Sequence, residues 1–289
     1  SRALIRALDD AGLKKDDIDG LCVGPTLSGE RASELWGMNP RWSGTGDAAQ
    51  CIIEATMAIN CGLCTTVALV YGNAQRSMDT AYGGSRVTGG GITSYFYYAP
   101  WGLTSQGALY ALFFQRHKLL YGTTDEQLGA IAVAFRKHAC LNPNAVMYGK
   151  PITIDDYMNS RMIADPIRLL DCVMPADGAA GLIMMSKAMA KAKGLHKTVI
   201  PIGYAERTNY GGGEPMMDIT WTGHKDAGQR AMKTAGLAVK DVASFHPYDD
   251  FIIAMMLQME MLGFCKHGQG CAFIKDNDFN FNGTLPLNT

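Results

Sequence analysis

The stretch that decides the fold is Phe245-His246-Pro247-Tyr248-Asp249-Asp250-Phe251, which an apolar helical run and the turn Leu262-Gly263-Phe264-Cys265 follow. It joins an expected strand to an expected helix and sets a tyrosine, two carboxylates and a histidine at that joint. Layered α/β folds usually build their sites at such joints. We therefore expect an α/β fold with a functional site around Tyr248.

Composition narrows the class of protein. With 289 residues, 47% hydrophobic and 18% charged, the chain is long enough to bury a large core as one big domain or as two fused halves. The net charge is −1 and no run of Lys or Arg stands out, so neither nucleic acid nor an anionic membrane is the expected principal partner. No apolar run reaches the ~18 residues of a membrane span, and the first residues do not form a signal peptide, so we expect a cytoplasmic protein.

The eight cysteines are scattered through apolar sequence, which is typical of reduced thiols in the cytosol. Cys61 and Cys64 have the spacing of a redox pair or of half a zinc site. No second pair or histidine completes the four ligands that a structural zinc site needs, so we interpret the spacing as coincidence and expect no metal.

A twelve-residue pattern occurs twice. Residues 7–18 (ALDDAGLKKDDI) match residues 231–242 (AMKTAGLAVKDV), with Ala-Gly-Leu at the same place and an aspartate plus a β-branched residue at the end. Each copy then runs into a strand, a loop and a long apolar helix, expected at 48–59 and 251–262. The pattern predicts an internal duplication around a pseudo-twofold axis. The alternative is that helix–glycine–strand junctions simply look alike, because a glycine commonly ends a helix.

Periodicity predicts the remaining elements. Helices are expected at 4–13, 106–120, 125–139 and 188–193, and strands at 18–23, 65–72 and 177–186. The strands at 65–72 and 177–186 are continuously apolar, which indicates buried strands in a sheet that is covered on both faces. The glycine- and aromatic-rich region from about 76 to 103 lacks the Lys-Ser or Lys-Thr of a phosphate loop, so we expect a lid or a subunit contact there.

Several segments together resemble the thiolase superfamily, most closely its lipid-transfer-protein branch of sterol-carrier-type thiolases and side-chain-cleaving acyl-CoA aldolases. They are residues 55–62 (ATMAINCG), 136–139 (RKHA) with Asn142-Pro143, 160–172 (SRMIADPIRLLDC), 177–180 (DGAA), and 248–251 (YDDF) with 262–265 (LGFC). The resemblance covers essentially the whole chain. It implies a five-layered αβαβα thiolase fold and a homodimer. The expected halves are residues 1–195, with a loop domain inserted at about 76–165, and residues 196–289.

One departure from the thiolase pattern concerns the nucleophile. The resemblance puts the thiolase cysteine at or near Thr45, within residues 43–47, and no cysteine is there. The acyl-enzyme step of a thiolase needs a thiol, because threonine without an activating base is a far poorer nucleophile. Cys51 lies six residues further on, almost two helical turns away, and is expected in the core. Thr45 and Gly46 are expected near the substrate thioester.

The second departure is Tyr248, which replaces the Asn or His that thiolases use to polarise the thioester oxygen. The replacement resembles the aldolases of the branch. A phenol can accept or donate a proton, which suits a retro-aldol reaction, where a β-hydroxyl loses its proton and the thioester α-carbon becomes an enolate. The alternative is that Tyr248 only packs at a strand end with its hydroxyl satisfied.

The residues near Tyr248 are expected to have supporting or structural roles. His246 shares its face if the strand continues, although Pro247 disturbs the alternation, and it is expected to support the site or the substrate. The carboxylates of Asp249 and Asp250 are expected to cap the following helix. His138 and His267 are expected on the surface or in loops, and four methionines of the following helix in the core.

Residues 281–289 resemble the strand and turn that precede a glycine-rich segment, which in this family carries the remaining catalytic histidine or, in aldolases, a second tyrosine. The chain is therefore expected to continue in a longer protein. We expect an acyl-CoA aldolase that cleaves a β-hydroxyacyl-CoA, with no cofactor beyond the coenzyme A of the substrate. The alternatives are a β-ketoacyl-CoA thiolase or acyltransferase of the branch and a non-catalytic scaffold that binds acyl-CoA. The resemblance also implies a small partner with an OB fold and a zinc finger.

Overall fold

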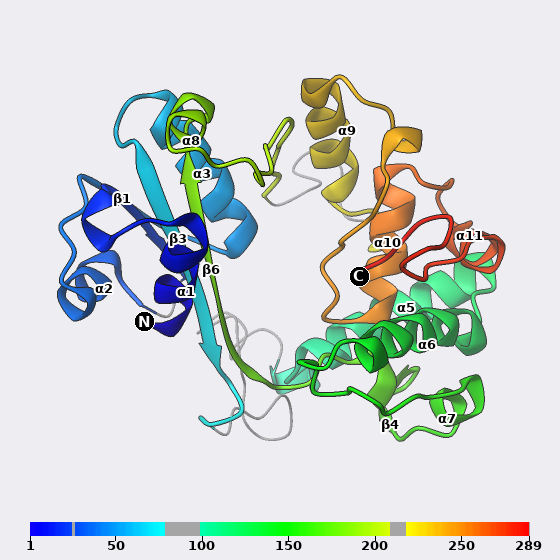
Figure 1. The fold of residues 1–289 in the computed structure, drawn as a ribbon. Helices are drawn as coiled ribbons and strands as arrows, with labels where there is room; N and C mark the ends of the chain where they lie inside the picture. The colour runs from blue at the N-terminus through cyan, green and yellow to red at the C-terminus, as the bar shows by residue number, and fades with distance from the viewer. Residues whose placement is uncertain (25–26, 79–98, 209–217, 289) are drawn as a thin grey trace. The chain divides into compact units, whose positions relative to one another are not determined.

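The structure is a computed structural model that describes residues 1–24, 27–78, 99–208 and 218–288. The chain divides into two compact units (Figure 1). Unit 1 comprises Ser1–Thr80 and Pro175–Pro201, and unit 2 comprises Ala81–Met174 and Ile202–Thr289. The two halves expected from the sequence stay a prediction, and most of the expected lid, residues 79–98, lies outside the described residues.

Unit 1 is built on a four-stranded sheet in the order β2-β1-β3-β6. Its strands are β1 (Gly20–Val23), β2 (Trp42–Thr45), β3 (Thr66–Ala74) and β6 (Asp177–Met185). The strand β1 pairs in parallel with both β2 and β3, whereas β6 runs antiparallel to β3. The carboxyl ends of β1 and β2 therefore lie side by side, with Val23 opposite Thr45.

Helices cover both faces of this sheet, as the apolar strand at 65–72 predicts. Leu21 and Ala68 pack with α1 (Arg2–Ala11) and α2 (Gly29–Trp36), while Cys22 and Val67 pack with α3 (Ala48–Asn60). Successive strand residues point to opposite faces, so one strand fills two cores. A short helix, α8 (Lys187–Ala192), follows β6.

The prediction that residues 177–186 form a buried strand is half wrong. The strand exists as β6, but its first six residues are exposed and Leu182 keeps 46% of its surface accessible. Among the described strands β6 is an edge, paired only with β3, and its Gly-Ala-rich start has little side-chain surface to bury. Small residues serve another purpose here, because a Cβ at Gly181 would lie 2.5 Å from the carbonyl oxygen of Ala3 in α1.

The repeated pattern forms the same local structure twice. The helix α1 ends at Gly12 with φ 62°, and α9 (His224–Ala235) ends at Gly236 with φ 68°. In both copies the glycine and the following leucine donate backbone hydrogen bonds back into the last turn. A 3₁₀ turn follows each, Lys15–Asp17 and Val239–Asp241, and its last aspartate accepts a hydrogen bond from the backbone N–H three residues earlier. Matching local geometry supports the predicted duplication.

Unit 2 is organised around α10 (Ile252–Leu262), in which residues 252–261 are all buried. The helices packed around it are α5 (Gln106–Tyr121), α6 (Asp125–Leu141), α9 and α11 (Gly270–Asp276) (Figure 1). The smaller elements are α7 (Ile154–Met158) and a short antiparallel pair, β4 (Met162–Ala164) and β5 (Ile167–Arg168). The predicted methionine core is confirmed, because Met255, Met256 and Met259 are completely buried.

The strand expected before α10 is represented by one parallel bridge, between Phe245 and Leu287. The N–H of Phe245 donates to the carbonyl of Pro286 over 2.9 Å, and the N–H of Asn288 donates to the carbonyl of Phe245 over 3.1 Å. This bridge holds the start of the Tyr248 segment against residues 286–288. Nowhere in the described ranges is a helix long and apolar enough to cross a membrane.

Candidate active site

The segment before α10 presents alternate side chains to solvent. Phe245 and Pro247 are buried, whereas His246 and Tyr248 are exposed. The two-residue period of an extended chain therefore continues through the proline, contrary to the expectation that Pro247 would disturb it. His246 and Tyr248 consequently lie on one face, and Tyr248 keeps 51% of its surface accessible.

The two carboxylates after Tyr248 bind side chains and do not cap the helix, so the capping prediction is wrong. The hydroxyl of Tyr248 donates to the carboxylate of Asp250. Asp249 accepts a hydrogen bond of 2.9 Å from the side-chain amide of Asn288. The N-cap position of α10 is Phe251, whose side chain makes no capping hydrogen bond. The phenol of Tyr248 therefore has a carboxylate as its immediate acceptor.

Burial and charge act on this group of residues. Desolvation raises the pKa of Asp249, the charge of Asp250 adds to that effect, and the hydrogen bond from Asn288 opposes it. A second phenol lies close by, because the ring of Tyr110 on α5 stacks on Phe251 with centroids 4.3 Å apart. Burial and the negative charge of Asp250 both raise the pKa of Tyr110.

The side chain of Gln258, a buried residue of α10, binds the backbone of Tyr248. The N–H of Tyr248 donates to Oε1 of Gln258 over 3.0 Å, and the carbonyl of Tyr248 accepts from Nε2 of Gln258 over 2.8 Å. Sequence reasoning missed Gln258, Asn288 and Tyr110. The available signal was a lone glutamine inside the run Ile252–Leu262, whose other polar residue is Glu260.

Unit 1 holds the residues expected near the thioester. Thr45 is the last residue of β2, and its side chain is exposed. Gly46 follows, and α3 begins at Ala48 with Asp47 as its cap. A pair of short parallel strands brings Thr45 to the carboxyl edge of the sheet, which is the usual place for a binding site in such folds.

Cys51 is a core residue of unit 1, as predicted. It is 4% exposed, and its thiol donates to the carbonyl of Gly46 over 3.4 Å. Desolvation is the main cause that raises the pKa of this thiol, and the nearby carboxylate of Glu54 adds to it. A thiol in these surroundings is a poor nucleophile, because the reactive form is the thiolate.

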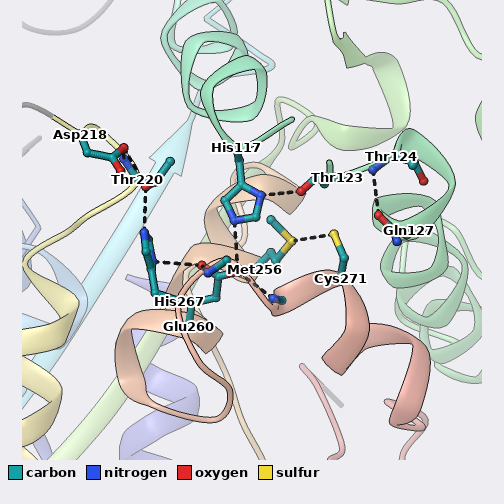
Figure 2. A network of polar contacts seen from close by, with 12 residues as sticks. His117, Thr123, Thr124, Gln127, Asp218, Thr220, Met256, Glu260, His267 and Cys271 are labelled. Carbon is teal, nitrogen blue, oxygen red and sulfur yellow. Dashed lines mark hydrogen bonds and ion pairs between the residues drawn. The ribbon is translucent and has the colours of Figure 1, made fainter. Parts of the chain in front are cut away.

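A network of buried polar groups joins α5, α10 and the loop after α10, as Figure 2 shows. Oε1 of Glu260 lies 3.1 Å from Nε2 of His117, and Oε2 lies 3.2 Å from Nδ1 of His267. The same carboxylate accepts hydrogen bonds from the backbone N–H groups of Gly268 and Gly270. A buried carboxylate with this many donors is a structural anchor for the loop.

One of the two histidines expected on the surface or in loops is placed differently. His267 does lie in a loop, but its ring packs between Tyr121 and Trp221, and its Nε2 atom lies 3.0 Å from the Thr220 hydroxyl. His138 is a half-buried residue of α6, and burial lowers its pKa. His138 lies inside the helix expected at 125–139, which the structure shows as α6, so it is not a loop residue.

All eight cysteines are free thiols, as predicted. Cys61 is exposed at the end of α3, whereas Cys64 is buried. Across the described part of the chain, no group of three or more histidine, cysteine, aspartate or glutamate side chains is arranged to hold a metal ion.

Comparison with known proteins places this geometry in a family. Residues 206–289 match the family model described as thiolase C-terminal domain-like. A 17-hydroxy-3-oxo-4-pregnene-20-carboxyl-CoA lyase of Mycobacterium tuberculosis is 34% identical over 313 residues, covering 100% of this chain and 79% of the relative. A steroid side-chain-cleaving aldolase of Thermomonospora curvata is 32% identical, covering 99% of this chain and 78% of that protein.

The fold agrees with these matches. The solved structure of an Ltp2-ChsH2(DUF35) aldolase superimposes with a TM-score of 0.85 at 31% identity, covering 98% of this chain and 75% of that one. The thiolase-like α/β fold and the matches over nearly the whole chain define an enzyme of the thiolase-like lyase class. The chain belongs to the thiolase superfamily, in its sterol-carrier-type branch close to the side-chain-cleaving aldolases, and it is an acyl-CoA aldolase.

Proposed function

We propose that Tyr248 is the proton-transfer residue with which this aldolase cleaves a β-hydroxyacyl-CoA. The observation that carries the assignment is the hydrogen bond from the exposed Tyr248 phenol to the carboxylate of Asp250. The phenol oxygen takes the proton of the substrate β-hydroxyl while its own proton passes to Asp250. The bond between the α- and β-carbons then breaks, and its electron pair goes to the α-carbon.

The products follow from that step. The β-carbon becomes a carbonyl, and the α-carbon becomes the enolate of a thioester. Tyr248 then gives a proton to the α-carbon and recovers one from Asp250, which yields a shorter acyl-CoA and restores both side chains. Neither free coenzyme A nor a covalent acyl-enzyme is needed, which agrees with the absence of a cysteine at Thr45. In this proposal Thr45 and Gly46 bind near the thioester, His246 supports the substrate from the face of Tyr248, and no cofactor takes part.

The proposed acyl group is a steroid side chain. The support is the name of the Mycobacterium tuberculosis relative, which puts a hydroxyl on carbon 17 and the carboxyl-CoA on carbon 20. That arrangement is a β-hydroxyacyl-CoA. The Thermomonospora curvata relative is likewise named for cleaving a steroid side chain.

We also propose a homodimer that works in the cytoplasm with a small partner subunit. The support for the partner is the similar solved structure, which is an aldolase of Ltp2 with ChsH2(DUF35). Co-expression with a DUF35-type chain followed by size-exclusion chromatography with light scattering tests it. Separate elution of the two chains would contradict the proposed complex, and a mass of one copy of this chain would contradict the dimer.

Activity of the full-length protein, with any co-purified partner, tests the residue assignment. We expect the β-hydroxyacyl-CoA to be split without added coenzyme A, and Tyr248→Phe to lower kcat by about 10²–10⁴-fold, the range of general acid–base catalysis. Cleavage of only a β-ketoacyl-CoA, and only with free coenzyme A, would instead indicate a thiolase. Tight binding of acyl-CoA with no turnover of either substrate would indicate a scaffold.

A further inference from the structure

We infer that Gln258 is a positioning residue for the reaction, because its side chain fixes the backbone of Tyr248. This inference rests on the proposed role of Tyr248. Gln258 is 5% exposed and lies in the second turn of α10, among side chains that are otherwise almost entirely apolar. Burying an amide without partners costs free energy, so its hydrogen bonds explain why a glutamine is tolerated there.

The hydrogen bonds of Gln258 use the groups that its amide offers. Oε1 accepts from the N–H of Tyr248, and Nε2 donates both to the carbonyl of Tyr248 and to the carbonyl of Ala254. A primary amide has two donor hydrogens, and both are engaged. The pair of hydrogen bonds to the N–H and carbonyl of Tyr248 resembles the pairing that a neighbouring strand makes.

The consequence is a tyrosine held at two points. Its backbone is fixed by Gln258, and its hydroxyl is bound to Asp250, while half of its surface remains accessible. The phenol oxygen must reach the substrate hydroxyl within hydrogen-bond distance for proton transfer. A shift of about 1 Å in such a group can cost about 10²-fold in rate. Loss of Gln258 therefore acts on kcat through Tyr248 and leaves substrate affinity largely intact.

A double-mutant cycle on the full-length protein tests this coupling. Gln258→Met keeps the length and removes both hydrogen bonds to Tyr248, and Met259→Leu is the matched control at a completely buried neighbour in the same helix. We expect Gln258→Met to lower kcat by about 10–10²-fold with KM within about threefold. We expect Met259→Leu to change kcat by less than about twofold.

The same substitutions in the Tyr248→Phe background separate positioning from general damage. If Gln258 acts through the phenol, Gln258→Met changes the residual rate of Tyr248→Phe by less than about twofold, because coupled residues are not additive. An equal fold-loss in both backgrounds, or an unchanged kcat in Gln258→Met alone, would overturn the inference. Should Gln258→Met not fold, Gln258→Glu replaces it, since a carboxylate cannot donate to the Tyr248 carbonyl, and the same fall in kcat is expected.

The two hypotheses fail differently. Full activity of Tyr248→Phe would contradict the proposed role of Tyr248 whatever Gln258 does. An inactive Tyr248→Phe together with a fully active Gln258→Met would contradict only the positioning role. Thermal unfolding of each variant accompanies the kinetics, and a kcat loss that simply follows loss of folded protein also counts against positioning.

Discussion

His117 and Glu260 form a pair of completely buried side chains, with Nε2 of the histidine 3.1 Å from Oε1 of the glutamate. The two residues come from different helices, α5 and α10, and are separated by 143 positions in the chain. The glutamate also accepts hydrogen bonds from the backbone N–H groups of Gly268 in the following loop and Gly270 at the start of α11. One carboxylate therefore ties a helix and a loop to the central helix of unit 2.

Replacing that carboxylate is expected to destabilise the protein strongly. Glu260→Leu leaves two backbone donors and a histidine without their acceptor, and we expect a loss of about 3–5 kcal/mol in the free energy of unfolding, as for other broken buried pairs. Glu126→Leu, at an exposed position in the first turn of α6, is the control and is expected to cost at most about 1 kcal/mol. Urea unfolding measures both, and equal effects would contradict the anchoring role.

The two helix-ending glycines make a matched pair. Gly12 and Gly236 have φ of +62° and +68°, and a Cβ at either would meet nothing within 4 Å. Only the backbone strain of a left-handed residue remains, so Gly12→Ala and Gly236→Ala should each cost about 1–2 kcal/mol. Gly178→Ala is the control: a Cβ at Gly178 would also meet nothing within 4 Å, but Gly178 does not have a left-handed φ. This substitution should stabilise β6 by about 0.5–1 kcal/mol. Clearly unequal losses of unfolding free energy in the two variants would argue against equivalent local structure at Gly12 and Gly236.

A buried acid in unit 2 gives a signed pH effect. Burial raises the pKa of Asp171 to about 6, although the hydroxyl of Tyr157 donates to it over 2.6 Å. The folded protein therefore holds this proton more tightly than the unfolded chain, whose aspartate titrates near 3.9. The associated stability is complete below about pH 4 and is lost as the pH rises through about 6.

Substitution isolates that contribution. In Asp171→Asn the group no longer titrates, so the difference in unfolding free energy between wild type and variant should change by up to about 3 kcal/mol between pH 4 and pH 7. The free energy of unfolding of the wild type should fall relative to that of the variant as the pH rises. Urea unfolding at pH 4, 5.5 and 7 checks the trend, and a difference that is constant or rises with pH would contradict it.

The thiols provide a test of the aldolase chemistry. Cys61 is exposed, whereas burial keeps the pKa of Cys51 above its usual value. We expect iodoacetamide at neutral pH to label Cys61 and not Cys51 in the folded protein, as read by peptide mass spectrometry. We also expect Cys51→Ala to keep cleavage activity within about twofold. An inactive but folded Cys51→Ala would reopen the search for an acyl-enzyme.

Much of the fold was predictable because it is locally encoded. Helices α5 and α6 begin after a serine and a threonine that are typical of helix starts, and α10 is a continuous apolar run. Gly12 and Gly236 are glycines of the kind that commonly end helices. The short strand β2 was not predicted, since four residues without an apolar run have no period to detect. The exposure of β6 also escaped prediction, because a strand's place at the edge of a sheet is not written in its own residues.

The site divides in the same way. Tyr248 and the missing cysteine at Thr45 were found by comparing the sequence with the thiolase pattern that it resembles, and their roles stay predictions. The contacts around them depend on the chain folding back. Gln258 reaches ten residues back to Tyr248, and Asn288 returns from 39 residues away to Asp249. The partners of His267 likewise come from separate helices and loops, so no local pattern announces them.

The hydrogen bonds between Gln258 and the backbone of Tyr248 affect which substitutions this position can accept. The hydrogen bonds that Gln258 makes to residue 248 use its peptide N–H and carbonyl, which every amino acid except proline supplies in full. These two hydrogen bonds therefore do not depend on which side chain residue 248 has. One residue can be exchanged for another at this position in evolution or in the laboratory, and the reaction can be altered while the scaffold that aims the new group is inherited unchanged.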